Sequence, residues 1–189
     1  MAELILKKLN KAYAEQEVLK DISAEIPAGS FAVVTGESGI GKTTLLRLLM
    51  GLEVCDSGEI IFEGEKTISA VFQENRLLPE FSAYQNVKAV CPLRKKAEIL
   101  EALAKLIPNA DFLKSPVESF SGGMQRRVAI VRAMLADSDL ILMDEPFSGL
   151  DAENKEKALA FIKEEQKGRS VIFALHAAKG IAWDLEIHL

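Results

Sequence analysis

The sequence has few cysteines, no long apolar run and no excess of basic residues. Its two cysteines, Cys55 and Cys91, lie far apart and lack the spacing of a metal site, which is typical of a protein from a reducing cytosol. No apolar run approaches the roughly 20 residues that cross a bilayer. The first residues lack the basic and apolar segments of a secretory signal. We therefore expect any membrane-spanning part to be supplied by another chain.

The balance of charge argues against a nucleic-acid partner. The 189 residues include 23 Lys and Arg against 28 Asp and Glu, for a formal net charge of −5, whereas a surface that binds nucleic acid is basic. The basic clusters, Arg94–Lys96 and Arg126–Arg127, are short. With 49% hydrophobic and 27% charged residues, the chain is expected to form one globular domain over residues 1–189.

A glycine-rich loop at 36–44 is the most informative segment. Its residues match the pattern G-x-x-x-x-G-K-[ST] that wraps the phosphates of a nucleotide. In this pattern backbone N–H groups face the anion, Lys42 contacts the β- and γ-phosphates, and Thr43 offers a hydroxyl to Mg²⁺. An apolar strand at 31–35 and a helix at 44–50 flank the loop, which favours a phosphate loop over an ordinary glycine-rich turn. The candidate nucleotide-binding residues are Gly36, Ser38, Gly39, Ile40, Gly41, Lys42, Thr43 and Thr44.

The remaining pattern predicts an α/β fold, namely a P-loop NTPase core with a mostly parallel sheet, an N-terminal antiparallel β patch and a helical insertion at 82–120. A further helix is expected at 152–167, and 183–189 would add an edge strand. The strands expected in the antiparallel patch are 3–9, about 18–26 and 58–64. The continuously apolar strands expected in the core are 31–35, 71–72, 140–143 and 171–175.

Polar residues that could bind a metal or take part in catalysis follow the ends of the core strands, which is where ligands bind in open α/β sheets. Asp144 is suited to hold Mg²⁺, directly or through water, and Glu145 to orient or deprotonate an attacking water. Gln73 could bind Mg²⁺ or this water through its amide. His176 could donate to the γ-phosphate as charge develops there. These four residues are the catalytic and metal-binding candidates, together with Thr43 for the metal.

A second glycine-containing motif, Ser121-Gly122-Gly123-Met124-Gln125, opens a helix. Ser121 can cap this helix, and the two glycines expose its first N–H groups, which forms a second end suited to bind an anion. One nucleotide does not need two such cradles from one chain. Two chains packed head to tail would use both, because each would offer this motif to the phosphate held by the other.

These motifs, in this order, resemble the ATP-binding subunits of ATP-binding cassette (ABC) transporters over nearly the whole chain. The loop at 36–44 is similar to the Walker A loop, and the strand 140–145 to the Walker B strand with its catalytic glutamate. The other matching segments are Tyr13 as the aromatic that stacks on adenine, Gln73 as the Q-loop, Ser121–Gln125 as the signature motif, Ser148–Asp151 as the D-loop and His176 as the switch histidine.

The resemblance implies a dimer of cassettes, of identical or different chains, that encloses two ATP molecules with Mg²⁺. It further implies transmembrane permease subunits as partners and a cytoplasmic, peripheral location at the inner face of the cell membrane. The loop 74–79 lies where the family contacts its membrane subunit, and Leu77, Leu78 and Phe81 could line that groove or could equally pack internally. The sequence of this loop resembles that of the corresponding loop in the importer branch for nitrate, sulfonate and taurine.

The chain departs from the family in two places. The stretch 64–73 is short, so we expect a trimmed antiparallel patch, and Ala177 stands where many members have an acid. Tyr13 could also be a core tyrosine at a strand end. Two other functions stay open: a soluble ABC-type ATPase that acts on nucleic acid or protein assemblies, and an ATP-gated dimerisation regulator.

Overall fold

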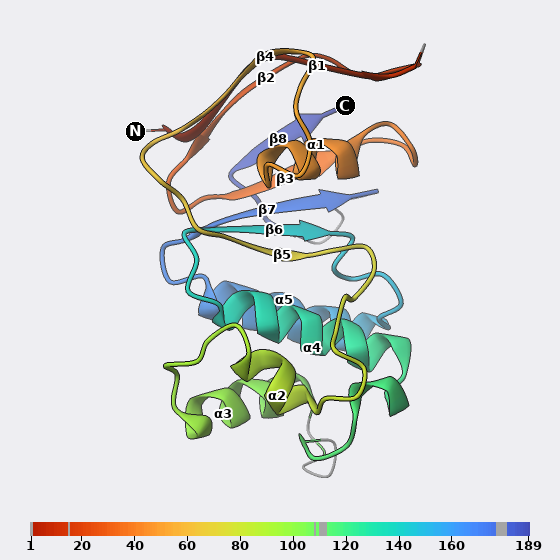
Figure 1. The fold of residues 1–189 in the computed structure, drawn as a ribbon, viewed down its shortest axis with the longest axis vertical. Coiled ribbons are helices and arrows are strands. Elements are labelled where there is room, and N and C mark those ends of the chain that lie inside the picture. Colours follow the sequence, from red (N-terminus) through yellow and green to blue (C-terminus); the bar gives the residue numbers. More distant parts are fainter. Residues whose placement is uncertain (1, 15, 108, 110–112, 177–180) are drawn as a thin grey trace. The chain divides into compact units, whose positions relative to one another are not determined.

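The computed structural model describes residues 2–14, 16–107, 109, 113–176 and 181–189 (Figure 1). The chain forms two compact units. Unit 1 comprises residues 1–68, 138–145 and 168–189, and unit 2 comprises residues 69–137 and 146–167. The strand β5 (Ile68–Val71) begins in the first unit and ends in the second.

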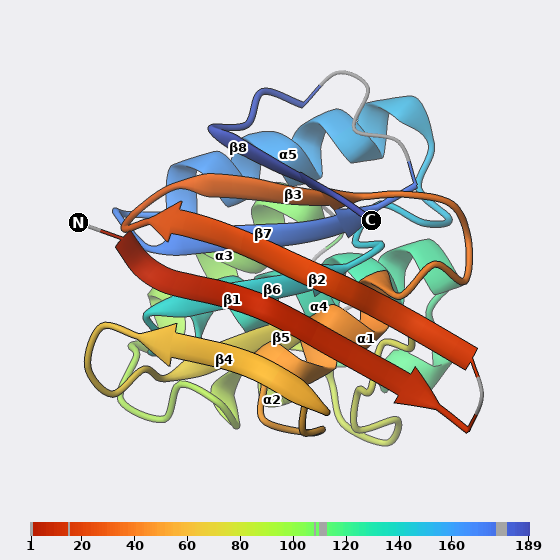
Figure 2. The same cartoon turned by 90° about the horizontal axis from the view of Figure 1, so that it is seen from above.

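Unit 1 contains an antiparallel sheet of three strands in the order β2-β1-β4. The strands are β1 (Ala2–Tyr13), β2 (Gln16–Pro27) and β4 (Ser57–Phe62), which lie side by side in Figure 2. Both β1 and β2 are longer than the sequence predicts, because register shifts carry the pairing past irregular positions. At these positions the Lys8 N–H donates to the Ser23 hydroxyl and the Asp21 N–H to the Asn10 side chain, which replaces missing strand-to-strand bonds.

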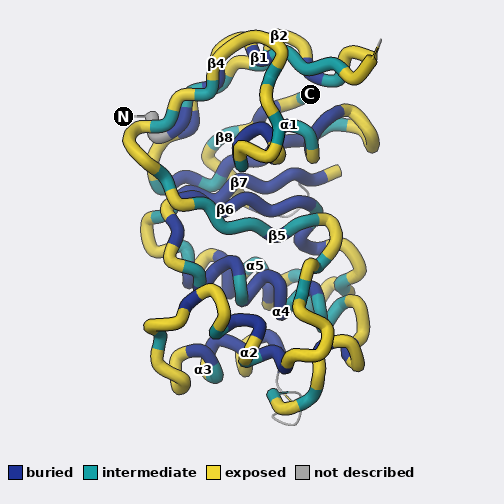
Figure 3. The backbone as a smooth tube through the Cα atoms, in the orientation of Figure 1, coloured by how far each residue is buried: buried dark blue, intermediate teal, exposed yellow. Residues whose placement is uncertain are grey.

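The parallel strands of unit 1 follow the order β6-β7-β3-β8. They are β3 (Phe31–Thr35), β6 (Leu140–Asp144), β7 (Ser170–Leu175) and β8 (Leu185–His188). Every residue of β6 and β7 is buried, as Figure 3 shows, which explains their continuously apolar sequences. The predicted edge strand is confirmed, since β8 pairs in parallel with β3.

The helix α1 (Lys42–Leu49) begins directly after the glycine-rich loop and packs against β6 and β7. Its buried face is formed by Leu45, Leu46, Leu48 and Leu49. Figure 1 shows α1 between the antiparallel strands and the parallel strands of unit 1. The start of α1 is therefore fixed from two sides.

Unit 2 is mainly helical. Its helices are α2 (Ala83–Lys88), α3 (Lys96–Leu106), α4 (Gly122–Leu135) and α5 (Ala152–Glu165), with a short 3₁₀ turn at Val117–Ser119. The helix α4 contacts the other three helices. It is accordingly buried at eight of its positions, from Arg126 to Leu135. Side chains cap three of the helices: Ser82 caps α2, Ser121 caps α4 and Asp151 caps α5.

A glycine at position 58 is required where β4 begins. Gly58 has a φ of 91°, and a Cβ atom placed there would lie 2.3 Å from the Lys8 carbonyl oxygen. We expect Gly58→Ala to lower the free energy of unfolding by about 3 kcal/mol or more, because backbone strain and a backbone clash add. Denaturant unfolding followed by circular dichroism measures this change.

Gly64→Ala is the matched control. Gly64 has a φ of 77°, but nothing lies within 4 Å of its Cβ position, so only the strain of about 1–2 kcal/mol applies. Equal losses of stability in the two variants would contradict the close approach of Gly58 to β1.

Candidate active site

The glycine-rich loop between β3 and α1 is shaped by close contacts to β2. Gly41 has a φ of 123°, and a Cβ atom there would lie 2.8 Å from both the Val18 Cγ1 atom and the Val18 carbonyl oxygen. Only glycine fits this position. The tip of the loop, from Ser38 to Ile40, is exposed, so its backbone is accessible to a ligand.

Lys42 lies inside this loop rather than in solvent. Its side chain is buried, and its Nζ donates to the carbonyl oxygens of Gly36 at 2.8 Å and Glu37 at 2.7 Å. The first turn of α1 contains no acidic residue and no side chain caps it. Its N–H groups and the Lys42 ammonium thus offer a concentrated positive site to an anion.

Thr43 and Asp144 meet at the start of α1 and the end of β6. The Thr43 hydroxyl donates to Asp144 Oδ2 at 2.7 Å, and Asp144 is only 6% exposed. A hydroxyl and a carboxylate oxygen are the hard ligands that Mg²⁺ prefers, and Mg²⁺ commonly uses one or two such protein groups beside phosphate oxygens and water. The pair therefore fits a magnesium ion bound together with phosphate.

Glu145 has an unusual backbone and a partly buried carboxylate. Its φ is 46°, and its N–H donates to the Ala174 carbonyl oxygen at 3.0 Å, which fixes the turn after β6. Among the described residues, its buried Oε1 has no hydrogen-bond partner. The imidazole of His176 lies beside it, with Nε2 at 3.6 Å from this atom. A buried acceptor without a partner, next to a phosphate-binding loop, is suited to bind a water molecule.

Burial raises the pKa of the Glu145 carboxyl above its ordinary value, and Asp144 acts in the same direction. The positive charges of His176 and Lys42 oppose this shift. A carboxylate with a raised pKa accepts a proton more readily at neutral pH than an exposed glutamate does.

Tyr13 ends β1 and is 44% exposed, which contradicts the alternative of a core tyrosine. Its hydroxyl donates to Glu53, and this hydrogen bond is the main cause that raises its pKa. A hydrogen bond with Thr44 acts in the opposite direction. Tyr13 therefore lies next to the first turn of α1, and its ring has accessible surface.

The predicted Q-loop in unit 2 is held by two arginines through contacts that no motif in the sequence indicates. Arg126 donates to the carbonyl oxygens of Phe72 and Gln73. Arg132 donates to the carbonyls of Asn75 at 3.1 Å and Arg76 at 2.6 Å. Both arginines come from α4. Arg126 is buried, so it is not part of a solvated face. The Gln73 side chain itself is exposed.

The signature motif and the D-loop come together within unit 2. The Ser121 hydroxyl accepts from the Met124 N–H at 3.3 Å, as predicted for a cap, and Ser121 and Gly122 are exposed. Gly123 packs closely against the Gly149 carbonyl, where a Cβ atom would lie at 3.1 Å. Ser148 is exposed as well.

Arg127 links these two segments through Asn154, which donates to Asp151. The two hydrogen bonds from Asn154 lower the pKa of Asp151. In this arrangement Asp151 caps α5. The Gln125 amide is engaged as well, since it donates to the carbonyls of Val117 and Phe120.

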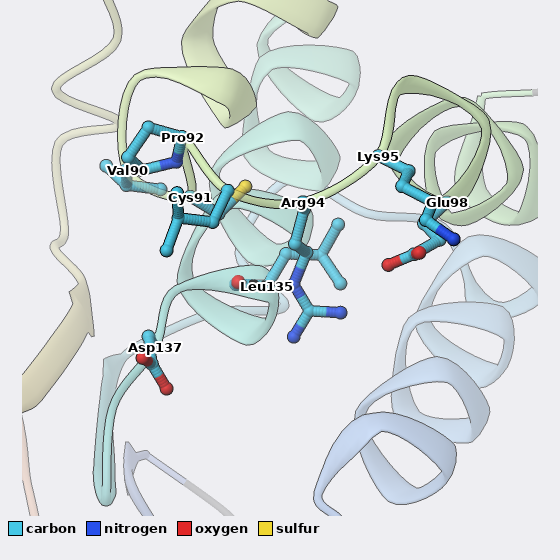
Figure 4. Close-up of a pocket in the computed structure, with 9 residues that line it drawn as sticks. Val90, Cys91, Pro92, Arg94, Lys95, Glu98, Leu135 and Asp137 are labelled. Carbon is cyan, nitrogen blue, oxygen red and sulfur yellow. Dashed lines mark hydrogen bonds between the residues drawn. The ribbon is translucent and has the colours of Figure 1, made fainter.

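Unit 2 also has a cavity of about 510 Å³ beside the connection between α2 and α3 (Figure 4). Val90, Cys91, Arg94 and Asp137 line it, and the Arg94 Nε donates to the Leu135 carbonyl at 3.0 Å. None of the predicted site residues lines this cavity, so it is separate from the candidate chemistry. The placement of Gln73 and of the signature motif toward the phosphate loop stays a prediction, as does the expected turn at Ala177, which lies outside the described residues.

Comparison with known proteins identifies the class. Residues 19–148 match the family model of the ABC transporter. The chain therefore belongs to the ABC transporter family, as an ATP-binding cassette.

Two curated relatives are import subunits. The chain is 34% identical over 188 residues to the spermidine/putrescine import ATP-binding protein of Clostridioides difficile (strain 630), covering 90% of this chain and 54% of that protein. It is 35% identical over 182 residues to the aliphatic sulfonates import ATP-binding protein of Bacillus cereus, and the match covers 91% of this chain and 72% of that protein. The chain thus spans about half the length of the first of these relatives.

The fold is similar to that of a solved dimer. The dimeric structure of MJ0796, a bacterial ABC transporter cassette, matches with a TM-score of 0.81 and 28% identity, over 92% of this chain and 88% of that one. The same cassette is known as a dimer in a post-hydrolysis state with ADP and Pi. The predicted fold class is confirmed.

The contact between Thr43 and Asp144 generates a prediction for metal dependence. Thr43→Val removes the hydroxyl, so we expect the affinity for ATP to lose its dependence on Mg²⁺, measured as the ratio of the Kd in excess EDTA to that in Mg²⁺. The variant also deprives the buried Asp144 of a hydrogen bond, which costs about 1–3 kcal/mol of unfolding free energy. Thr43→Ser retains the hydroxyl and serves as the control. A Thr43→Val protein with the wild-type ratio would exclude this residue as a metal ligand.

Proposed function

We propose that this chain is an ATPase subunit that powers the transport of a solute through separate membrane-spanning subunits, with residues 1–189 acting as one ATP-binding domain. The observation that carries the proposal is the arrangement in unit 1. A positive phosphate loop, a hydroxyl–carboxylate pair at Thr43 and Asp144, and the buried Oε1 of Glu145, which has no hydrogen-bond partner among the described residues, lie around the start of α1. A nucleotide-binding switch without hydrolysis has less use for such a base.

The first step of the mechanism is the binding of ATP. The Lys42 ammonium exchanges the carbonyls of Gly36 and Glu37 for phosphate oxygens, while N–H groups of the loop and of α1 hold the same phosphates. Thr43 and Asp144, with Gln73 as a further candidate, would hold Mg²⁺, which would neutralise charge on the phosphates. Tyr13 stacks on adenine.

In the chemical step, Glu145 orients a water molecule at Oε1 and accepts its proton as the water oxygen bonds to the γ-phosphorus. The bond between this phosphorus and the oxygen of ADP breaks, so the products are ADP and phosphate. His176 is more than half exposed at 55% of its side chain. It is free to rotate toward the γ-phosphate and to donate to the oxygens that gain charge.

The second half of the site comes from a second cassette. Ser121, Gly122 and Gly123 present the uncapped N–H groups of α4 to the nucleotide of the partner chain, with Gln125 holding the turn and Ser148 and Asp151 at the same face. The dimers known for MJ0796 support this arrangement. The partner is an identical or a different cassette.

The membrane partner is a permease, as the import subunits among the relatives support. Within the described ranges, every helix is too short or too polar to cross a bilayer. Leu78 and Phe81, after the Q-loop, are 47% and 44% exposed. Their exposure favours a docking surface over internal packing, and a peripheral location at the inner face of the cell membrane follows.

The proposed base is tested by Glu145→Gln. The substitution retains the shape of the side chain but cannot accept the proton, so we expect kcat to fall by about 10²-fold or more while the Kd for ATP stays within about twofold of wild type. A coupled assay for phosphate release and a fluorescent-nucleotide titration measure these two quantities.

Glu59→Gln, an exposed glutamate of β4, is the control and should behave as wild type. Lys42→Ala should instead weaken binding itself. Normal turnover by Glu145→Gln would remove this residue from the mechanism, and unchanged ATP affinity in Lys42→Ala would refute the phosphate loop.

A further inference from the structure

The side chain of Tyr13 is held at its tip by Glu53. Glu53 lies in the connection between α1 and β4, 40 residues along the chain, and its Oε2 accepts a hydrogen bond from the Tyr13 hydroxyl. The Lys11 ammonium lies 5.4 Å from the centroid of the Tyr13 ring. With 44% of the residue still exposed, the ring keeps surface for a second aromatic group. A surface tyrosine would otherwise sample several rotamers.

Glu53 is itself oriented by α1. Its other oxygen, Oε1, pairs with Arg47 Nη1 at 3.1 Å. Arg47 comes from the last turn of α1, and the Glu53 side chain is only 20% exposed. Because both oxygens of the carboxylate are engaged, its plane is fixed, and with it the position of the Tyr13 hydroxyl.

The backbone next to Tyr13 is held by the same connection. Asp56 Oδ2 accepts from the Ala12 N–H at 2.7 Å, and Asp56 Oδ1 pairs with Lys11 Nζ at 2.8 Å. In return, the Asp56 N–H donates to the Asn10 carbonyl at 2.9 Å. Tyr13 is therefore fixed at two points, the preceding backbone and its own hydroxyl, by two carboxylates of one connection.

The position of Tyr13 relates this arrangement to the nucleotide. The Thr44 side chain lies close enough to the Tyr13 hydroxyl to affect its pKa, and Thr44 follows the two residues that contact phosphate and metal in the proposed mechanism. With Tyr13 stacked on adenine as proposed, the base of a nucleotide whose phosphates lie in the loop is on the side of β1. The ring is also linked through Glu53 and Arg47 to the helix that begins at these phosphates.

We infer that Glu53 is a positioning residue for the nucleotide base, because its carboxylate holds the Tyr13 ring in the orientation that receives the base. This inference rests on the proposed stacking of Tyr13 on adenine. Preorganisation of the ring lowers the entropy lost on binding, so it adds to the affinity for ATP without contacting the nucleotide. Substitution of Glu53 is therefore expected to change the affinity for the base and to leave the affinity for the phosphates unchanged.

The test compares two ligands that differ by the nucleoside. The Kd values of Mg-ATP and of Mg-tripolyphosphate, which lacks a base, are measured by competition with a fluorescent nucleotide on the full chain. We expect Glu53→Ala to weaken ATP binding about three- to tenfold, the value of one hydrogen bond, and to leave tripolyphosphate binding unchanged. Tyr13→Phe should have the same effect. The double variant, Glu53→Ala with Tyr13→Phe, should bind ATP no more weakly than either single variant.

Two further variants, and a second use of Tyr13→Phe, make the outcome specific. Glu53→Gln retains an oxygen that can accept from Tyr13, so it should recover most of the affinity lost in Glu53→Ala. Glu63→Ala, an exposed glutamate of the same unit, should bind both ligands as wild type. Tyr13→Phe retains the pair of Glu53 with Arg47 and tests the inference even if Glu53→Ala is poorly folded.

The failure of the inference and that of the proposed stacking are distinguishable. If Tyr13→Ala binds ATP as wild type, adenine stacking by Tyr13 is refuted. If Tyr13→Ala is weaker while Glu53→Ala and Tyr13→Phe bind ATP normally, stacking holds and the positioning role is overturned. Equal weakening of ATP and tripolyphosphate in Glu53→Ala would mean that Glu53 only supports the fold around α1.

Discussion

The register of the parallel strands in unit 1 determines where its reactive groups lie. Thr35 at the end of β3 pairs with Leu175 of β7, and Asp144 of β6 pairs with Ala174 of the same strand. The strands β3, β6 and β7 therefore end at the same edge of the sheet, and the residues that follow them lie close together there. The phosphate loop, Glu145 and His176 are such residues. A shift of one residue in this register would turn the Asp144 side chain to the opposite face of the sheet and separate it from the Thr43 hydroxyl.

The same packing buries charged groups whose hydrogen bonds are incomplete, and the proposed chemistry depends on these groups. Asp144 and Lys42 are each 6% exposed, and Glu145 leaves a buried oxygen without a partner in the described part of the chain. Such groups cost stability unless a ligand satisfies them. Without a ligand, Lys42 donates hydrogen bonds to loop carbonyls, and Asp144 accepts one from Thr43. Phosphate, metal and water are the partners that complete this set, so binding and the stability of the loop are expected to be linked.

Much of the site in unit 1 could be predicted from the sequence because its signals are local. The loop at 36–44 has fixed spacing, and Asp144, Glu145 and His176 directly follow strands whose apolar residues mark their own ends. The length of β1 and β2 could not be predicted, since it depends on hydrogen bonds that the side chains of Ser23 and Asn10 accept from backbone N–H groups across the sheet.

The supporting residues were missed for the same reason. Arg126 and Arg132 hold loop carbonyls more than 50 residues away, and Glu53 holds a tyrosine at a separation of 40. No short motif in the sequence records such long-range contacts. The helix α4 also contains Arg127 and Arg132, so its charged residues do not single out Arg126 in the sequence, and only the structure shows that Arg126 is buried.

The central claim is that one cassette binds ATP and a second cassette completes the site. It is tested most directly by the solution mass of the Glu145→Gln variant, measured by light scattering on a sizing column with and without Mg-ATP. We expect a monomer without nucleotide and a dimer with saturating Mg-ATP, and the dimer should be lost when Ser121→Arg is added. A mass that does not change with Mg-ATP, in a variant that demonstrably binds the nucleotide, would refute the shared site.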